Sequence, residues 1–171
     1  MNKPAAKPRG MLQPALLDRL RDDEPGNLTE PATAHMLSRE TLRQFVVRDL
    51  EWLFNSTCVL SASQTKESPS LAASVLAYGM PPIAGQLATL IDVRDFESMI
   101  ASLIRRFEPR IDPRTLQVKA DAAQGVLNLH NVIGLRISGL LWACPHPIEL
   151  ALRSEVDLET GRVALMPLSG F

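Results

Sequence analysis

Residues 92–120 read DVRDFESMIASLIRRFEPRIDPRTLQVKA, and the spacing of their apolar positions changes partway through. Up to Phe107 the apolar residues recur at the three- and four-residue intervals of an amphipathic helix, with Asp92 placed to cap its start. Pro109 disfavours helical geometry at Glu108, so we expect the helix to end there. After the second proline the apolar residues alternate, as in a strand with one buried face. The stretch therefore predicts a helix that leads through a short turn into a sheet.

Helical patterns precede this stretch. Residues 39–54 carry a second amphipathic pattern behind a capping serine, Ser38, and residues 69–77 favour a short helix. The mixed polar segment that starts at residue 55, between these two, indicates a loop.

Strand patterns follow it. Residues 132–143 and 148–157 alternate, DLETG at 157–161 is typical of a hairpin turn, and RVALM at 162–166 is typical of a short last strand. Helices followed by tightly connected strands predict an α+β fold, in which N-terminal helices pack on a small, mostly antiparallel β-sheet formed by the C-terminal half.

The chain divides into two parts by composition. We expect residues 38–171 to form a single α+β domain, since this length suffices for one core. Residues 1–37 are rich in proline and charge, and we expect them to form a flexible N-terminal arm. Leucines at helical spacing predict a short amphipathic helix within this arm, at residues 11–21.

The composition argues against several classes of function. A formal net charge of −1 provides no basic field for nucleic acid or anionic lipid. Aromatic residues make up only 5%, which is sparse for a site that stacks sugars or single-stranded nucleic acid. No apolar stretch approaches the length of a membrane span, and the basic start lacks the apolar core of a signal peptide. With two cysteines and no disulfide pattern, we expect a cytoplasmic protein.

No metal or cofactor site is expected. His35, His130 and His146 are scattered, and only Cys144 brings a second soft ligand close to one of them, whereas a closed zinc site needs about four ligands. There is no glycine-rich phosphate loop. Cys58 lacks the strand-turn-helix signature of a catalytic nucleophile, so we assign no catalytic residue of that kind.

Glycoside hydrolysis is the enzymatic alternative, because it needs two carboxyl groups about 5–10 Å apart, one with a raised pKa. The available carboxyls are Glu51, Glu108, Glu155 and Asp157. Arginines at positions 48, 110 and 153 lie near the three glutamates, and such neighbours lower a carboxyl pKa, which is the wrong direction for a general acid. Solvated surface ion pairs are the simpler interpretation.

Glu108, Pro109 and Arg110 have two interpretations. A helix end with cations suited to its dipole accounts for the proline but does not require the flanking Glu108 and Arg110. A Glu/Arg pair on a rigid turn would offer a partner protein a bidentate ion-pairing site. Because exposed ion pairs contribute about 0–1 kcal/mol, we expect charge reversal at Arg110 to abolish partner binding and to leave melting almost unchanged.

The last strand is a second candidate for a protein contact. RVALM, with Arg162, Val163 and Leu165, has open backbone donors and acceptors if it lies at a sheet edge, and such an edge accepts a strand from another chain. The alternative is an edge covered by the rest of the protein.

Several segments together resemble a known family. They read LLDRLRDDEP, LRQFVVRDLEWLFN, SVLAYGMPPIAG, RRFEPRIDPRTLQV and ISGLLWACPHPIELALRSEVDLETGRV. In them the chain resembles the TssE family, the baseplate wedge subunit of type VI secretion systems, and is similar to the lysozyme-like baseplate protein of contractile phage tails. The resemblance covers roughly residues 12–165. Segment 121–131 departs from it by being more apolar than the expected loop, which leaves the local strand pairing open.

The resemblance implies a non-enzymatic structural role in a cytoplasmic baseplate, docked at the inner face of the inner membrane. There the protein would bind the other wedge subunits and start polymerisation of the contractile sheath. A peptidoglycan hydrolase remains the alternative function, and a weaker one is an adaptor whose segment 11–21 binds a groove. The lysozyme likeness describes similarity, and no catalysis is carried over from it.

The resemblance also implies partner-binding residues. The family's E-P-R motif, which is thought to hold the core helical bundle of the baseplate, falls on Glu108, Pro109 and Arg110. Residues 148–167 are implied to meet the first sheath ring by strand addition. The LLDRL segment is implied to form a further contact arm, with Leu16, Leu17 and Leu20.

Overall fold

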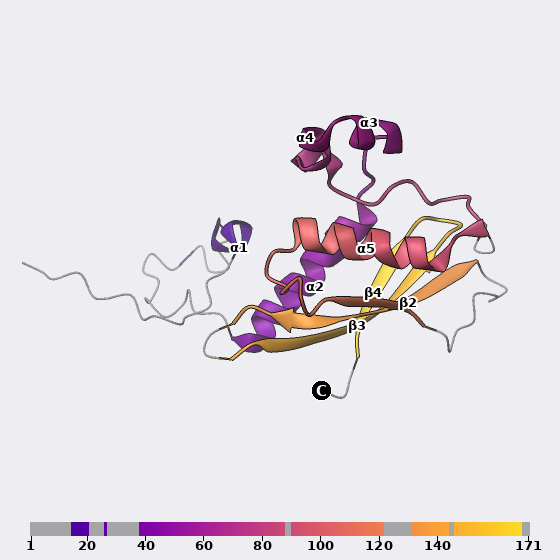
Figure 1. Ribbon diagram of the computed structural model, residues 1–171. Coiled ribbons are helices and arrows are strands. Elements are labelled where there is room, and N and C mark those ends of the chain that lie inside the picture. The colour runs from indigo at the N-terminus through magenta and orange to yellow at the C-terminus, as the bar shows by residue number, and fades with distance from the viewer. Residues whose placement is uncertain are drawn as a thin grey trace, which may run out of the picture.

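The computed structural model describes residues 15–20, 26, 38–87, 90–121, 131–143 and 146–168. Helices come first and strands last, which confirms the predicted α+β class (Figure 1). The helices are α1 (Leu16–Leu20), α2 (Arg39–Asn55), α3 (Ala62–Glu67), α4 (Pro69–Ala72), the 3₁₀ helix η1 (Val75–Ala77) and α5 (Val93–Phe107). The strands are β1 (Gln117–Ala120), β2 (Val132–Leu141), β3 (Ile148–Asp157) and β4 (Val163–Pro167).

The four strands form one antiparallel sheet in the order β1-β2-β3-β4. The predicted hairpin between β3 and β4 is confirmed: the Oδ1 of Asp157 accepts hydrogen bonds from the N–H groups of Glu159 and Thr160, at 2.8 and 3.2 Å. Gly161 completes the turn with a φ of +74°, a conformation that L side chains rarely adopt. The tight turn therefore fixes the register of the last two strands.

One face of the sheet packs against α2 and α5. Side chains alternate along β3, so that Ile148, Leu150, Leu152 and Val156 are buried while their neighbours are exposed or half-buried. From the helices, the core receives five residues of α2 and five of α5. These are Leu42, Val46, Leu50, Leu53, Phe54, Phe96, Ile100, Ala101, Leu103 and Ile104. The apolar residues that recur at helical spacing in α2 and α5 and at strand spacing in β3 thus pack together in one core layer.

Both predicted helix caps are confirmed. The hydroxyl of Ser38 accepts a hydrogen bond from the Thr41 N–H at 2.9 Å, and the Oδ1 of Asp92 accepts from the N–H of Arg94 at 2.8 Å. At its other end α5 stops at Phe107, and Glu108 is its C-cap residue, as the following proline predicts.

The loop expected from residue 55 is wrong in part, since α3 forms within it. Its start carries a reciprocal capping box, in which Ser61 accepts from the Gln64 N–H and Gln64 accepts from the Ser61 N–H. The short helix expected over 69–77 is divided into α4 and η1, because the Ser74 hydroxyl caps a new turn there. In Figure 1 these short helices lie above α5, away from the sheet.

Two expectations concern residues that lie mostly outside the described ranges. The open question of strand pairing over 121–131 falls mainly on residues 122–130, and of the helix predicted at residues 11–21 only residues 15–20, with α1, are described. Among the helices that the structure does describe, none is long and apolar enough to cross a membrane.

Candidate functional site

The Glu108–Pro109–Arg110 turn is held on both sides by backbone hydrogen bonds. On the helix side, the Glu108 N–H donates to the Ile104 carbonyl at 2.8 Å. On the sheet side, the Trp142 N–H donates to the Arg110 carbonyl at 2.8 Å, just beyond the end of β2. The turn thus has a fixed position between α5 and the sheet, as expected for a rigid presentation of its side chains.

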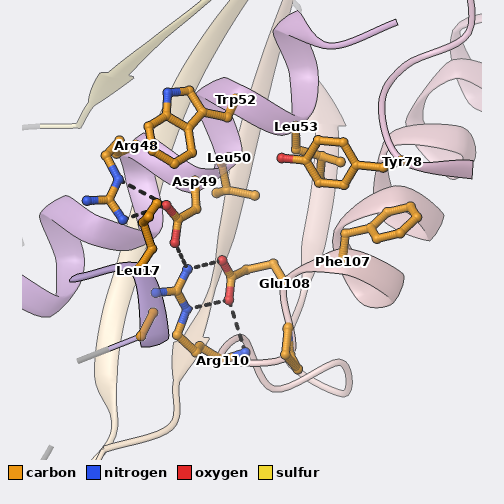
Figure 2. A pocket seen from close by; sticks show the side chains of 12 residues that line it. Leu17, Arg48, Asp49, Leu50, Trp52, Leu53, Tyr78, Phe107, Glu108 and Arg110 are labelled. Carbon is orange, nitrogen blue, oxygen red and sulfur yellow. Dashed lines mark hydrogen bonds and ion pairs between the residues drawn. The ribbon is translucent and has the colours of Figure 1, made fainter. Parts of the chain in front are cut away.

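Glu108 and Arg110 bond to each other across the proline. The Oε1 of Glu108 accepts from the Arg110 Nε at 2.7 Å and from the Arg110 backbone N–H at 3.1 Å, and its Oε2 accepts from Nη2 (Figure 2). Glu108 is only 3% exposed. The expectation of a solvated surface pair is therefore wrong for Glu108, since its carboxylate is enclosed and its bidentate partner belongs to the same turn.

The pair extends into a network that reaches α2 and α1. Arg110 Nη2 also donates to the Oδ2 of Asp49, and Arg48 donates to the Oδ1 of Asp49 at 2.8 and 3.0 Å (Figure 2). Arg48 Nη1 then donates at 2.6 Å to Asp18, whose side chain is 4% exposed. Opposite charges alternate along this chain of five residues, which links three helical segments.

The network raises the pKa of its two arginines. Burial lowers the pKa of Arg110, but the hydrogen bonds and charges of Glu108 and Asp49 outweigh burial and raise it above its ordinary value. The hydrogen bond to Asp18 is the largest influence on Arg48, and the pKa of that guanidinium is also raised. Both arginines consequently stay charged at any physiological pH.

A cavity of about 440 Å³ opens beside this network. Its walls combine four charged residues of the network with Tyr78 and with apolar side chains in or next to α1, α2 and the end of α5. They are Ala15, Leu17, Leu50, Trp52, Leu53, Tyr78, Phe107 and Pro109. Among the described residues Arg110 Nη1 is buried without a hydrogen-bond partner. We call this cavity, with its twelve lining residues, the turn groove.

Among the described side chains of the predicted contact arm, Asp18 makes the ion pair that links the arm to the domain. Leu17 lines the turn groove and is 56% exposed, and Leu20 is 74% exposed. The side chain of Leu16 lies outside the described part of the structure. Two of the three predicted leucines are thus accessible, and the ion pair with Arg48 is the specific link to α2.

The predicted strand edge exists, and one residue of α2 covers its beginning. The Asp157 N–H donates to the Arg162 carbonyl and the Leu168 N–H to the Ala151 carbonyl, so every second residue of β4 bonds to β3. The N–H and carbonyl groups of Val163 and Leu165 therefore point away from β3. Asn55 bonds to both groups of Val163, at 3.0 Å from its N–H and 2.9 Å from its carbonyl.

The side chains of the predicted strand residues have a different role from their backbones. Val163 and Leu165 are 6% and 7% exposed and belong to the core. Arg162 precedes β4, and its carbonyl takes part in the hairpin ladder. Of Val163 and Leu165 only the backbone faces outward, so any contact by these two residues is a main-chain contact.

The candidate carboxylates of a glycosidase are partly brought together. Glu51, Glu155 and Asp157 line a second cavity, of about 600 Å³, whereas Glu108 lies in the turn groove. The hydroxyl of Thr160 and two backbone N–H groups lower the pKa of Asp157, and Arg153 lies 3.6 Å from Glu155. The lowered pKa of Asp157 is the wrong direction for a general acid.

Metal ligands are scattered in the described part of the chain, where no group of three histidines, cysteines or acids comes together. Of the residues considered from the sequence, His35, His130 and Cys144 lie outside the described ranges.

Sequence reasoning missed Asp49, Asp18 and Asn55. It placed Arg48 near Glu51, whereas the hydrogen bonds of Arg48 go to Asp49 and Asp18. The one available signal was that Arg48 and Asp49 interrupt the apolar pattern of α2 as an adjacent opposite-charge pair. No local sequence feature indicates that Asp49 also bonds to Arg110, because the two residues are 61 positions apart in the chain.

A fixed turn carrying a buried ion-pair network beside an apolar groove, together with a partly open strand edge, is typical of a subunit that assembles with other proteins. The comparison with protein families names the assembly. The model of the family described as Baseplate wedge protein gp25 matches residues 40–146, more than half of the chain, and the chain belongs to that family. No match was found among curated proteins, and none among solved structures.

Family membership confirms the resemblance to baseplate wedge proteins. The matched region contains α2, α5 and the Glu108–Pro109–Arg110 turn, and it ends before β3. The protein has a structural role in a baseplate, and its family implies contacts with other baseplate proteins.

Proposed function

We propose that this protein is the wedge subunit of a type VI secretion baseplate, a non-enzymatic component that binds the other wedge subunits and initiates sheath polymerisation. Family membership supports the baseplate role. The single observation that carries the binding role is the buried pairing of Glu108 with Arg110 on the wall of the turn groove. In this proposal the baseplate lies in the cytoplasm, at the inner face of the inner membrane.

The turn groove is the proposed wedge-binding surface. Trp52 is 48% exposed and Leu17 56%, so the groove offers apolar area that a partner helix would cover. Arg110 belongs to this surface through the part of its side chain that is exposed, which is 25%, while its Nη1 is buried. Glu108 and Asp49 hold the guanidinium in the orientation that this contact needs.

The edge of β4 is the proposed sheath-binding surface. Strand addition requires outward main-chain groups, and Leu165 provides an N–H and a carbonyl that point away from β3. Residues 148–167 would thus present a preformed hairpin to which the first sheath ring adds a strand. Within the same proposal, residues 38–171 act as one domain and residues 1–37 as an arm whose LLDRL segment makes a further contact.

A pull-down of the other wedge subunits tests the groove. Trp52→Ala removes an exposed groove side chain and leaves the Glu108–Arg110 pair in place, but it also removes the ring over which the Arg48 guanidinium lies at 4.8 Å. We expect it to lose the co-purifying wedge subunits with only a small fall in melting temperature. Trp142→Ala is the matched control, because Trp142 is 59% exposed and does not line the groove. Retention of the wedge subunits by Trp52→Ala would refute this binding surface.

Sheath formation in cells tests the initiating role. Deletion of the gene should abolish sheaths, seen by fluorescence microscopy of a labelled sheath subunit, while the membrane components stay stable. Sheaths at normal frequency in the deletion strain would contradict the proposal.

The hydrolase alternative draws on the cavity shared by Glu51, Glu155 and Asp157. Incubation of the purified protein with labelled cell wall over an acidic pH series distinguishes it from the structural role. We expect no release of label. Release that disappears in Glu155→Gln or Glu108→Gln would reverse this conclusion.

A further inference from the structure

Asn55 takes the place of a neighbouring strand at the beginning of β4. Its Oδ1 accepts from the Val163 N–H at 3.0 Å, and its Nδ2 donates to the Val163 carbonyl at 2.9 Å. These are the two hydrogen bonds that one residue of an antiparallel strand would make to Val163. The side-chain amide therefore satisfies one position of an otherwise open edge.

The helix holds this amide in place. Asn55 is the last residue of α2, and its Nδ2 also donates at 2.9 Å to the carbonyl of Glu51, one turn earlier. Leu50 and Leu53 of the same turns are fully buried, so the end of α2 is anchored to the core. Displacing Asn55 from Val163 would break two hydrogen bonds and leave an amide to find new partners.

The groups that remain open on β4 lie after Val163. The Leu165 N–H and carbonyl and the Pro167 carbonyl point away from β3, and Pro167 has no N–H to offer. The open part of the edge thus consists of one donor and two acceptors. Proline at an edge position is a common way of limiting how far a strand pairs.

We propose that Asn55 sets the register of strand addition, so that a partner strand pairs with β4 from Leu165 onward and never at Val163. This inference rests on the proposed function, which supplies the sheath subunit as the partner. The partner segment is an extended strand that offers two N–H donors and one carbonyl acceptor. Its pairing with β4 is short and specific, because Asn55 already bonds to Val163 at one end and Pro167 has no N–H to donate at the other.

The charge around the covered end indicates the composition of that segment. Glu51, Glu155, Asp157 and Arg162 line the cavity next to Val163, and with Arg153 lying 3.6 Å from Glu155 the acids still outnumber the bases by one. A strand that carries a lysine or arginine at its end nearest Asn55 is electrostatically favoured there.

Hydrogen exchange followed by NMR tests the register with the full chain and the purified sheath subunits of the same secretion system. In the free protein we expect the Val163 amide and the Asn55 side-chain amide to be protected and the Leu165 amide to exchange fast. On binding, Leu165 should lose its fast exchange while the Asn55 side-chain amide stays protected.

The two ways of failing are distinguishable. If binding protects Leu165 but exposes the Asn55 side-chain amide, the partner has taken Val163, and the register proposal is wrong while strand addition stands. If the sheath subunits bind without changing Leu165, or do not bind, then strand addition at β4 itself is wrong and the register proposal falls with it.

Asn55→Ala provides a second test, because it frees the N–H and carbonyl of Val163 from their bonds to the Asn55 side chain. We expect the Val163 amide to exchange fast in the free variant and to become protected on sheath binding, as the paired segment lengthens by one position. Ser56→Ala is the matched control: the Ser56 hydroxyl bonds at 2.7 Å to the Trp52 carbonyl at the same helix end and does not contact β4. If Val163 stays unprotected in the complex of Asn55→Ala, a feature other than Asn55 limits the register, which overturns the proposal.

Discussion

Arg110 Nη2 donates to Asp49 on α2 and to Glu108 at the end of α5, and the first of these residues is 61 positions away in the chain. One guanidinium thereby joins the two helices that pack on the sheet. The contact is electrostatic and partly buried, so it adds a directional link to an apolar core that is itself non-directional. The turn is consequently part of the folded scaffold as well as of the proposed binding surface.

Replacement of Arg110 by methionine should strongly destabilise the protein, which corrects the expectation of almost unchanged melting, because that expectation took the Glu108–Arg110 pair to be exposed. Glu108, at 3% exposure, would lose the cation that pairs with it, and breaking a buried pair from one side costs about 3–5 kcal/mol. Urea unfolding monitored by circular dichroism measures this loss in the free energy of unfolding. An Arg110→Met variant with wild-type stability would show that Glu108 does not depend on the pair.

Two further variants separate burial from charge. Arg114→Met removes an ion pair to Asp112 in which the arginine side chain is 77% exposed, and we expect almost no loss in the free energy of unfolding, because solvent screens an exposed pair. The double variant Glu108→Leu/Arg110→Met replaces the buried pair by apolar groups and should regain most of the lost stability, because such replacements are often neutral.

Asp18→Asn should release α1 from α2. The substitution keeps the size of the side chain but removes the charge that pairs with Arg48, and a hydrogen bond between charged groups contributes about 1.5–3 kcal/mol. We expect faster amide exchange in α1 and unchanged exchange in the buried turns of α2. Equal exchange of α1 in both proteins would mean that other contacts hold this helix.

The pKa of Tyr78 provides a probe of the network. Burial raises this pKa first, and the negative charges of Asp49 and Glu108 add to the effect. Tyr78 is the single tyrosine of the chain, so the absorbance of tyrosinate reports on it alone. Asp49→Asn should shift the titration midpoint down toward the ordinary value of about 10, whereas Asp95→Asn, at the far end of α5, should leave it unchanged.

The same shift makes stability depend on alkaline pH. Because the pKa of Tyr78 is higher in the folded protein than in the unfolded chain, its contribution is fully present below about pH 10 and is lost as pH rises through the folded pKa. Between about pH 10 and the folded pKa of Tyr78, we expect the free energy of unfolding to fall more in the wild type than in Asp49→Asn, as measured by urea unfolding at each pH.

Gly79→Ala should destabilise the protein more than Gly85→Ala. Both glycines have positive φ, of +103° and +83°, which disfavours alanine at either position. A Cβ at Gly79 would also lie 2.5 Å from the carbonyl oxygen of Ser56, whereas a Cβ at Gly85 would meet nothing within 4 Å. Thermal melting of the two variants separates the steric clash from the backbone effect, and equal melting temperatures would contradict this explanation.

Local signals predicted the fold well. The change of period after Pro113, the caps at Ser38 and Asp92 and the DLETG turn each depend on neighbouring residues, and the structure contains all of them. The helix α3 was missed because its residues are polar and its stability comes from a capping box, which carries no apolar period.

The network could not be predicted from neighbouring residues. Sequence spacing placed Arg110 beside Glu108 but gave no measure of burial, and the burial of Glu108 depends on how α2 packs against the turn. The role of Asn55 was equally hidden, because it depends on a contact with Val163 over 108 residues. Both features arise from tertiary packing, which a single sequence does not display.

Helix α2 carries Asp49 toward the turn groove and Asn55 toward the edge of β4, and Trp52 lines the cavity at each of these places. Six residues of a regular helix span about 9 Å and cannot stretch without breaking backbone hydrogen bonds. If the wedge and the sheath bind where we propose, α2 sets the distance between the two binding surfaces. A force on the bound sheath strand would then be transmitted through one rigid helix to the wedge. The position of the first sheath ring relative to the wedge would be fixed by the rise of that helix.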